Sequence, residues 1–156
     1  REQIEPGHFV FPDQFIDRTT KRINTYFDGS DVQHVSMGDP FSSEMRNCLV
    51  RACDQLGFTY HDSGTVVTIE GPRFSTKAES IMFRSWGCDI INMSTVPEVI
   101  LARHAGMKVA ALSVITNMAA GMSDEELSHE QTMANADIGI QDLQILLISY
   151  LNIVSS

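Results

Sequence analysis

Three apolar stretches of the chain each end in residues that could recognise a small molecule. Phe74, in TIEGPRFSTKAE, can stack on a flat ligand. Ser94 and Thr95, in IINMSTVPEV, would offer hydroxyls and free N–H groups to an anion at the start of a helix. Asn117, in SVITNMAAG, has an amide that matches a planar heterocycle with a carbonyl next to an N–H. This chemistry is non-covalent recognition, because we find no Ser/His/Asp or Cys/His spacing typical of covalent catalysis.

Each of these residues also has a structural interpretation, and the sequence leaves both open. Phe74 would fill the core at a strand–helix turn, and the neighbouring Arg73 would form an ion pair. Ser94 or Thr95 would act only as a helix N-cap. Asn117 would bond the backbone of its own turn.

Two histidines lie where they could meet the same ligand. His129 follows Ser128, the expected N-cap of the last helix, and the dipole there favours a neutral imidazole that can bond a sugar hydroxyl. His34 lies in a long polar and aromatic segment over 17–41. Loops of that length in a compact domain are typically functional or part of an interface.

These residues must be positioned by strands that alternate with helices. The strands over 88–93 and 107–116 are apolar without alternation, which indicates that both of their faces are covered. The pattern predicts an α/β fold with a mixed central sheet flanked by helices, in which ligands bind past the carboxyl ends of the strands. In chain order we first expect a strand over 8–16 that Pro12 interrupts and that runs into a loop, and then a helix from Ser42 or Ser43 to Leu56. One or two strands over 58–70 follow, and after them a helix over 75–87 capped by Ser75. The remaining elements are the strand over 88–93, a helix over 94–106, the strand over 107–116 and a helix over 129–154.

Composition limits the partners of the chain. Its 156 residues carry a formal net charge of -9 without a basic cluster, which argues against a nucleic acid as partner. No apolar run is long enough to span a membrane, and the first residues lack the apolar core of a signal peptide. The cysteines, Cys48, Cys53 and Cys88, show no zinc-binding spacing. We therefore expect reduced, buried thiols, no metal site and a cytoplasmic protein.

Three motifs together resemble a known family, the trimeric nucleoside phosphorylases, and in particular its methylthioadenosine phosphorylase branch. They are DQFIDRTT, TIEGPRFSTKAES and NMSTVPEV. The match corresponds to the C-terminal two-thirds of such an enzyme, so residues 1–156 would be the C-terminal part of a single phosphorylase domain. The N-terminal part with the glycine-rich phosphate loop would be missing from this chain, or would be supplied as a separate segment.

The family reaction is phosphorolysis, in which orthophosphate attacks the anomeric carbon of a purine nucleoside and releases the base and a pentose 1-phosphate. The resemblance implies no metal, no cofactor and no covalent intermediate, with phosphate as co-substrate. By position, the resemblance assigns Ser94 to the phosphate, Met93 to the ribose and Phe74 to stacking on the base, with Ile91 and Asn92 on the pocket wall. It also implies a homotrimer, in which His34 reaches the 5′ end of the substrate bound to a neighbouring subunit.

Departures from the adenine-specific branch lead us to expect a different substrate. That branch carries aspartates at the positions of Asn117 and Ala119. The enzymes for 6-oxopurines instead use an asparagine at N7 and O6 of the base and a histidine at the 5′-hydroxyl, which Asn117 and His129 match. We therefore expect phosphorolysis of inosine or guanosine, with Asn117 as the catalytic residue.

Ser75 favours the alternative substrate, methylthioadenosine. The 6-oxopurine enzymes place a glutamate at this position to accept the N1–H of the base, whereas the methylthioadenosine branch has a serine. A more remote alternative is a non-catalytic nucleoside-binding module.

Overall fold

The strands of the described residues form two small sheets. The computed structural model describes residues 1, 3–27, 29–122 and 128–155. One sheet has the order β3-β1-β6, with β3 at Tyr60–His61, β1 at Phe9–Val10 and β6 at Ser113–Val114. The other has the order β2-β4-β5, with β2 at Gln14–Arg18, β4 at Thr65–Ile69 and β5 at Ile90–Asn92. All pairs are parallel except β1 with β6. The predicted mixed α/β fold is therefore confirmed, with two sheets in place of one.

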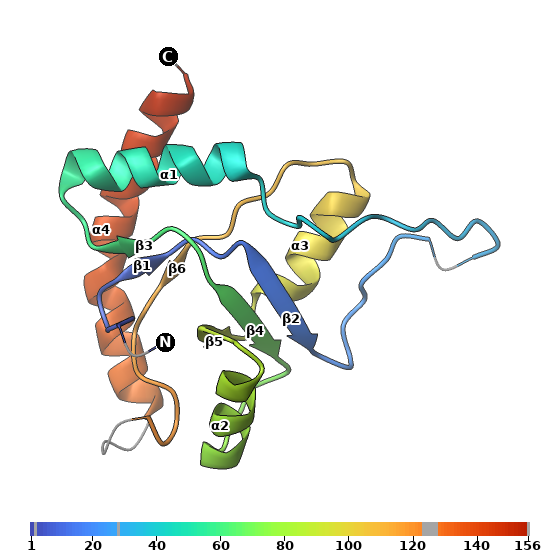
Figure 1. Ribbon diagram of the computed structural model, residues 1–156, viewed down its shortest axis with the longest axis horizontal. Helices are drawn as coiled ribbons and strands as arrows, with labels where there is room; N and C mark the ends of the chain where they lie inside the picture. The colour runs from blue at the N-terminus through green and yellow to red at the C-terminus, as the bar shows by residue number, and fades with distance from the viewer. Residues whose placement is uncertain (2, 28, 123–127, 156) are drawn as a thin grey trace.

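Helices pack against both sheets (Figure 1). The helices are α1 at Ser43–Leu56, α2 at Lys77–Ser85, α3 at Thr95–His104 and α4 at His129–Val154. Leu49 of α1 and Leu146 of α4 share a buried cluster with Phe9 of β1. Phe83 of α2 packs against Val67 of β4. Residues of α3 form a further cluster that includes Val96 and Val99.

Helix boundaries with local capping signals follow the sequence. Ser42 caps α1 by accepting a hydrogen bond from the N–H of Met45, and Gly57 ends the helix with a φ of 70°. Ser128 caps α4 by accepting from the N–H of Gln131. Both helices were predicted from these residues, and both predictions are confirmed.

The predicted cap of α2 is wrong by one residue. Thr76, not Ser75, accepts from the N–H of Glu79, and the Glu79 carboxylate accepts in return from the N–H of Thr76. This capping box requires a Glu three residues after the cap, a spacing that Thr76 satisfies and Ser75 does not. Ser75 is thereby left free to turn its side chain inward.

Two predicted strands differ from the structure. The strand over 8–16 is two strands, because the buried Pro12 separates β1 from β2 and β2 belongs to the second sheet; the long loop begins after Arg18. Of the strand over 107–116, Ser113–Val114 forms the strand β6 beside β1, and Ile115 extends this pairing through backbone bonds with His8 and Gly7. Residues 109–112 are apolar because they lie between two cores: Ala110 and Leu112 pack on the cluster around Phe9, and Val109 and Ala111 pack on the cluster around Val99.

The segment between β2 and α1 extends away from the body as a long loop (Figure 1). Ile23, Tyr26 and Val32 are exposed on it. The Phe27 ring stacks on His104 of α3, with ring centroids 5.6 Å apart. The expectation of a long loop here is confirmed.

Helix α4 contacts α1 and β6 and leaves a large apolar surface exposed. It approaches β6 closely, since a Cβ on Gly139 would lie 2.6 Å from Cγ1 of Val114. By length and composition, α4 is also a helix that could cross a membrane, the one such helix among the described residues. The expectation of no membrane span therefore stays a prediction.

Candidate functional site

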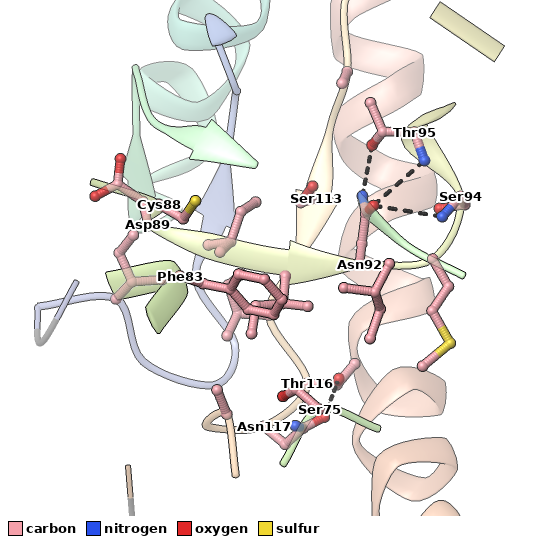
Figure 2. A pocket seen from close by; sticks show the side chains of 18 of the residues that line it. Ser75, Phe83, Cys88, Asp89, Asn92, Ser94, Thr95, Ser113, Thr116 and Asn117 are labelled. Carbon is pink, nitrogen blue, oxygen red and sulfur yellow. Dashed lines mark hydrogen bonds between the residues drawn. The ribbon is translucent and has the colours of Figure 1, made fainter. Parts of the chain in front are cut away.

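A pocket of about 800 Å³ lies where β4, β5 and β6 end. Because β4 and β5 are parallel, the segments that follow them leave the sheet at the same edge. The segment after β6 reaches the same place (Figure 2). Nine of the residues predicted from the sequence line the pocket: Phe74, Ser75, Ile91, Asn92, Met93, Ser94, Thr95, Asn117 and Ala119.

Asn92, at the end of β5, organises the start of α3 (Figure 2). Its Oδ1 accepts from Oγ1 of Thr68 at 3.0 Å and from the N–H groups of Ser94 and Thr95 at 3.4 Å. Its Nδ2 donates to Oγ1 of Thr95. Asn92 therefore supplies the capping contacts that the sequence assigned to a serine or threonine.

Ser94 is released from a capping role by this arrangement. It occupies the N-cap position of α3, but its side chain forms no capping hydrogen bond. The residue is exposed and lines the pocket. Its hydroxyl can therefore meet a ligand in the pocket, although Val96, with a φ of -105° and a ψ of 132°, separates Ser94 from the regular part of α3.

The segment after β4 and helix α2 contribute a flat ring and two buried hydroxyls. Phe74 is half-buried and lines the pocket, so it does not fill the core as its structural interpretation would require. Ser75 and Ser80 are buried, with their Oγ atoms 2.9 Å apart, and both line the pocket. One O–H satisfies this pair, which leaves the second O–H and several lone pairs for a ligand.

Met93 is held against the turn that follows β4. Gly71 has a φ of 68°, and a Cβ there would lie 2.7 Å from Sδ of Met93. Only a glycine allows this approach of the thioether to the backbone. The Met93 side chain is thereby placed on the pocket wall.

Asn117, after β6, has local partners and also lines the pocket. Its Oδ1 accepts from Oγ1 of Thr116 at 2.7 Å, and Oγ1 of Thr132 lies 3.4 Å away. Its Nδ2 donates to the carbonyl of Met118 at 2.9 Å. Both interpretations of this residue thus hold together: the turn fixes the amide, and one N–H of Nδ2 remains for a ligand.

The two predicted histidines lie outside the pocket. His129 is exposed in the first turn of α4 and does not line it. The segment 123–127, which precedes this turn, lies outside the described residues. His34 is exposed in the long loop. The structure of one chain therefore does not bring either histidine to the other predicted residues.

The end of the DQFIDRTT motif and the two residues after it bond the segments that follow β4 and β5. Glu70, directly after β4, accepts from the N–H of Thr20 at 2.6 Å and from the N–H of Lys21 at 3.1 Å. The bond from Thr20 holds the pKa of the Glu70 carboxyl below its ordinary value. Arg22 donates to the carbonyls of Glu70 and Val96. The motif thereby ties the end of β4 to the start of α3.

Arg73 forms the ion pair that its structural interpretation predicts. Both of its terminal nitrogens lie 2.7 Å from carboxylate oxygens of Glu79. This bidentate pair, together with the capping bond from Thr76, lowers the pKa of Glu79 to about 2. The pair fixes the first turn of α2 next to Phe74.

Sequence reasoning assigned His129 of α4 to the site and missed Thr132 and Asn135 of the same helix. Thr132 lines the pocket, and Asn135 donates from Nδ2 to the carbonyl of Thr116 at 2.6 Å. A signal was present, because Thr132 and Asn135 are three residues apart at the start of a mostly apolar helix and so share a face. Ser80 was missed as well, and it lies five residues after Ser75 on α2.

Comparison with known proteins agrees with this fold. The family model described as the phosphorylase superfamily matches residues 1–152, and the chain belongs to this superfamily. A solved methylthioadenosine phosphorylase from Schistosoma mansoni in complex with adenine superposes with a TM-score of 0.94 at 31% identity, over 100% of this chain and 62% of that one.

Curated relatives carry the same enzyme name. The S-methyl-5'-thioadenosine phosphorylase of Danio rerio is 50% identical over 131 residues, which cover 81% of this chain and 47% of the relative. That of Ciona intestinalis is 44% identical over 161 residues, which cover 99% of this chain and 58% of the relative. The chain thus spans about half the length of the curated relatives it matches.

These names contradict the expected preference for inosine and guanosine. That expectation depended on Asn117 and His129. An amide is an ambiguous signal, because it carries a donor and an acceptor and matches more than one pattern on a purine edge. His129 does not line the pocket, so its match to a 5′-hydroxyl contact has no support from the geometry.

Proposed function

We propose that the full-length protein phosphorolyses S-methyl-5'-thioadenosine to adenine and a pentose 1-phosphate that keeps the methylthio group. The observation that carries this proposal is the neutral hydroxyl pair of Ser75 and Ser80 in the pocket of a chain that resembles enzymes of this name. N1 of adenine is an acceptor, and a hydroxyl can donate to it. A carboxylate at this position would instead repel it.

The pocket residues then have distinct roles. The ring of Phe74 stacks on the adenine, Ile91 and Asn92 form the wall, and Ala119 leaves room beside the base. Met93 packs against the ribose. The base and the sugar are thus held in fixed orientation, which removes much of the entropic barrier to the displacement.

Charge stabilisation comes from the other two strand ends. Ser94 donates to orthophosphate at the start of α3, where the anion also faces the developing positive charge of an oxocarbenium-like transition state. The free N–H of Asn117 donates to N7 of the departing base as negative charge accumulates there. We assign Asn117 the catalytic role on this ground. Orthophosphate is the co-substrate, and the reaction calls for no metal or organic cofactor.

The long loop fits a role between subunits. It extends from the body, and its exposed apolar residues Ile23, Tyr26 and Val32 suit an interface. In a homotrimer His34 of one copy would reach the 5′ end of a substrate bound to the next. His129 receives no role here, because methylthioadenosine has no 5′-hydroxyl. Sedimentation of the full-length protein tests the trimer, and three free cysteines accord with a cytoplasmic location.

A substrate panel tests the proposed reaction. The full-length protein is given methylthioadenosine, adenosine, inosine or guanosine, with and without phosphate, and base release is followed by chromatography. We expect phosphate-dependent release of adenine from methylthioadenosine, with kcat/KM at least roughly tenfold above that for inosine, or ~1.4 kcal/mol in the transition state. Chelation of metals leaves the rate unchanged. Release of hypoxanthine from inosine without release of adenine would contradict the proposal.

A further inference from the structure

The start of α4 is bonded to the end of β6. Nδ2 of Asn135 donates to the carbonyl of Thr116 at 2.6 Å, and both residues are partly buried. Oγ1 of Thr132, one turn earlier, lies 3.4 Å from Oδ1 of Asn117. Helix α4 therefore contacts the segment that carries Asn117 through the side chains of Thr132 and Asn135.

This segment has few other restraints on its backbone. Ile115 is held on both sides, since its N–H donates to the carbonyl of His8 and its carbonyl accepts from the N–H of Gly7. Past Ile115, pairing with β1 ends. Over 116–118, within the part of the chain that the structure describes, the backbone bonds are those from the Asn135 and Asn117 side chains. Asn135 is thus the long-range restraint on the peptide between Thr116 and Asn117.

We propose that Asn135 is a positioning residue for the purine base. Its amide fixes the Thr116 carbonyl, and this fixes the direction in which Asn117 presents its remaining N–H to the pocket. A hydrogen bond between base and amide weakens steeply when its angle departs from linearity, so a small rotation of this peptide costs base affinity. The inference rests on the proposed function, because it takes adenine as the base that Asn117 meets.

The effect of Asn135 is confined to one side of the pocket. Ser94 lies at the end of β5 and is organised by Asn92, which shares no hydrogen bond with Asn135. Loss of the Asn135 donor should therefore weaken binding of adenine and leave the interaction with phosphate unchanged. A residue that only stabilises the fold would affect both.

The test replaces the donor without changing the shape of the side chain. In Asn135→Asp a carboxylate oxygen faces the Thr116 carbonyl and repels it. We expect the Kd of the full-length protein for adenine, measured by calorimetry, and the KM for methylthioadenosine to rise at least roughly tenfold. The KM for phosphate should stay within about twofold of the wild-type value.

The matched control is Asn152→Asp, which makes the same change at an exposed position near the end of the same helix. It should leave the Kd for adenine and the KM for methylthioadenosine unchanged. Amide hydrogen exchange over 113–119 should be faster in Asn135→Asp than in Asn152→Asp. This measurement detects the lost restraint on the backbone of the segment independently of enzyme activity. Asn135→Ala removes the donor without adding a charge, and it serves if the Asp variant does not fold.

The outcomes separate the two proposals. If the wild-type protein binds adenine and the Asn135 variants bind it equally well, the positioning role is overturned while the proposed function stands. Equal losses toward adenine and phosphate would also overturn it, because they indicate a general structural role. If wild-type protein neither binds adenine nor releases it, the proposed function fails, and the role for the base falls with it.

Discussion

At the scale of single residues, the contact between Gly71 and Met93 is a steric constraint on the pocket wall. In Gly71→Ala the new Cβ would lie 2.7 Å from Sδ of Met93, at a backbone φ of 68° that alanine rarely adopts. Met93 must move. Because we assign Met93 to the ribose, we expect the KM for methylthioadenosine to rise about tenfold, while the Kd for free adenine changes little.

Gly57→Ala is the control for Gly71→Ala. Gly57 has a similar φ of 70°, and nothing lies within 4 Å of a Cβ placed there. Both variants should lose about 1 kcal/mol of folding stability from the strained backbone, as read from thermal melts. Only Gly71→Ala should change the KM. Equal kinetics in the two variants would show that Met93 does not contact the sugar.

Residue types predicted the location of the site better than its selectivity. Phe74, Ser94 and Asn117 were chosen because they follow apolar strands, and the structure places all three on one pocket. The substrate depended on what Asn117 would accept or donate. That depends on the neighbouring Thr116 and also on Thr132 and Asn135, whose proximity is set by the packing of α4 and not by local sequence.

At the scale of elements, the capping box of α2 should make stability depend on acid. The pKa of Glu79 is about 2 in the folded protein against an ordinary 4.5, chiefly because of Arg73. A folded-state pKa below the unfolded value adds stability above the unfolded pKa, and this stability is lost as the pH falls from about 4.5 toward about 2. We expect the melting temperature to fall across this window.

Glu79→Gln should reduce the dependence of the melting temperature on pH in this acidic window. The variant keeps an N3 side chain that can bond the N-cap but has no charge to lose. Glu130→Gln, which changes an exposed glutamate in the first turn of α4, is the control and should retain the wild-type slope. Thermal melts between about pH 2 and pH 7 measure all three proteins. If the slope of Glu79→Gln matches that of wild type, the acid sensitivity arises elsewhere.

Elements with local signals were predictable, and elements defined by pairing were not. The ends of α1 and α4 follow from Ser42, Gly57 and Ser128, each of which acts within one turn. The segment 109–112 has the composition of a strand, because its two faces enter different cores. Whether it pairs depends on the position of other strands, which no local pattern encodes.

At the scale of the whole molecule, the outer face of α4 is the largest departure from an ordinary soluble surface. Met133, Ile140, Leu147 and Val154 are spaced by seven residues and are all exposed, and Leu151 lies on the same face. Such a stripe matches the seam of a helix that packs against another helix. Exposed apolar surface of this extent drives association.

We therefore expect the 156-residue chain by itself to self-associate and to bind a hydrophobic dye. Replacing Leu147 and Leu151 with lysine should lower both the sedimentation coefficient and the dye fluorescence, because charged side chains interrupt the apolar stripe. The lysines also reduce a net charge of -9, so Asn152→Lys, on the same helix, serves as the control for charge and should associate as wild type does. If the wild-type chain sediments as a monomer and does not bind the dye, the prediction is contradicted. The apolar stripe would then be covered by other parts of the same chain.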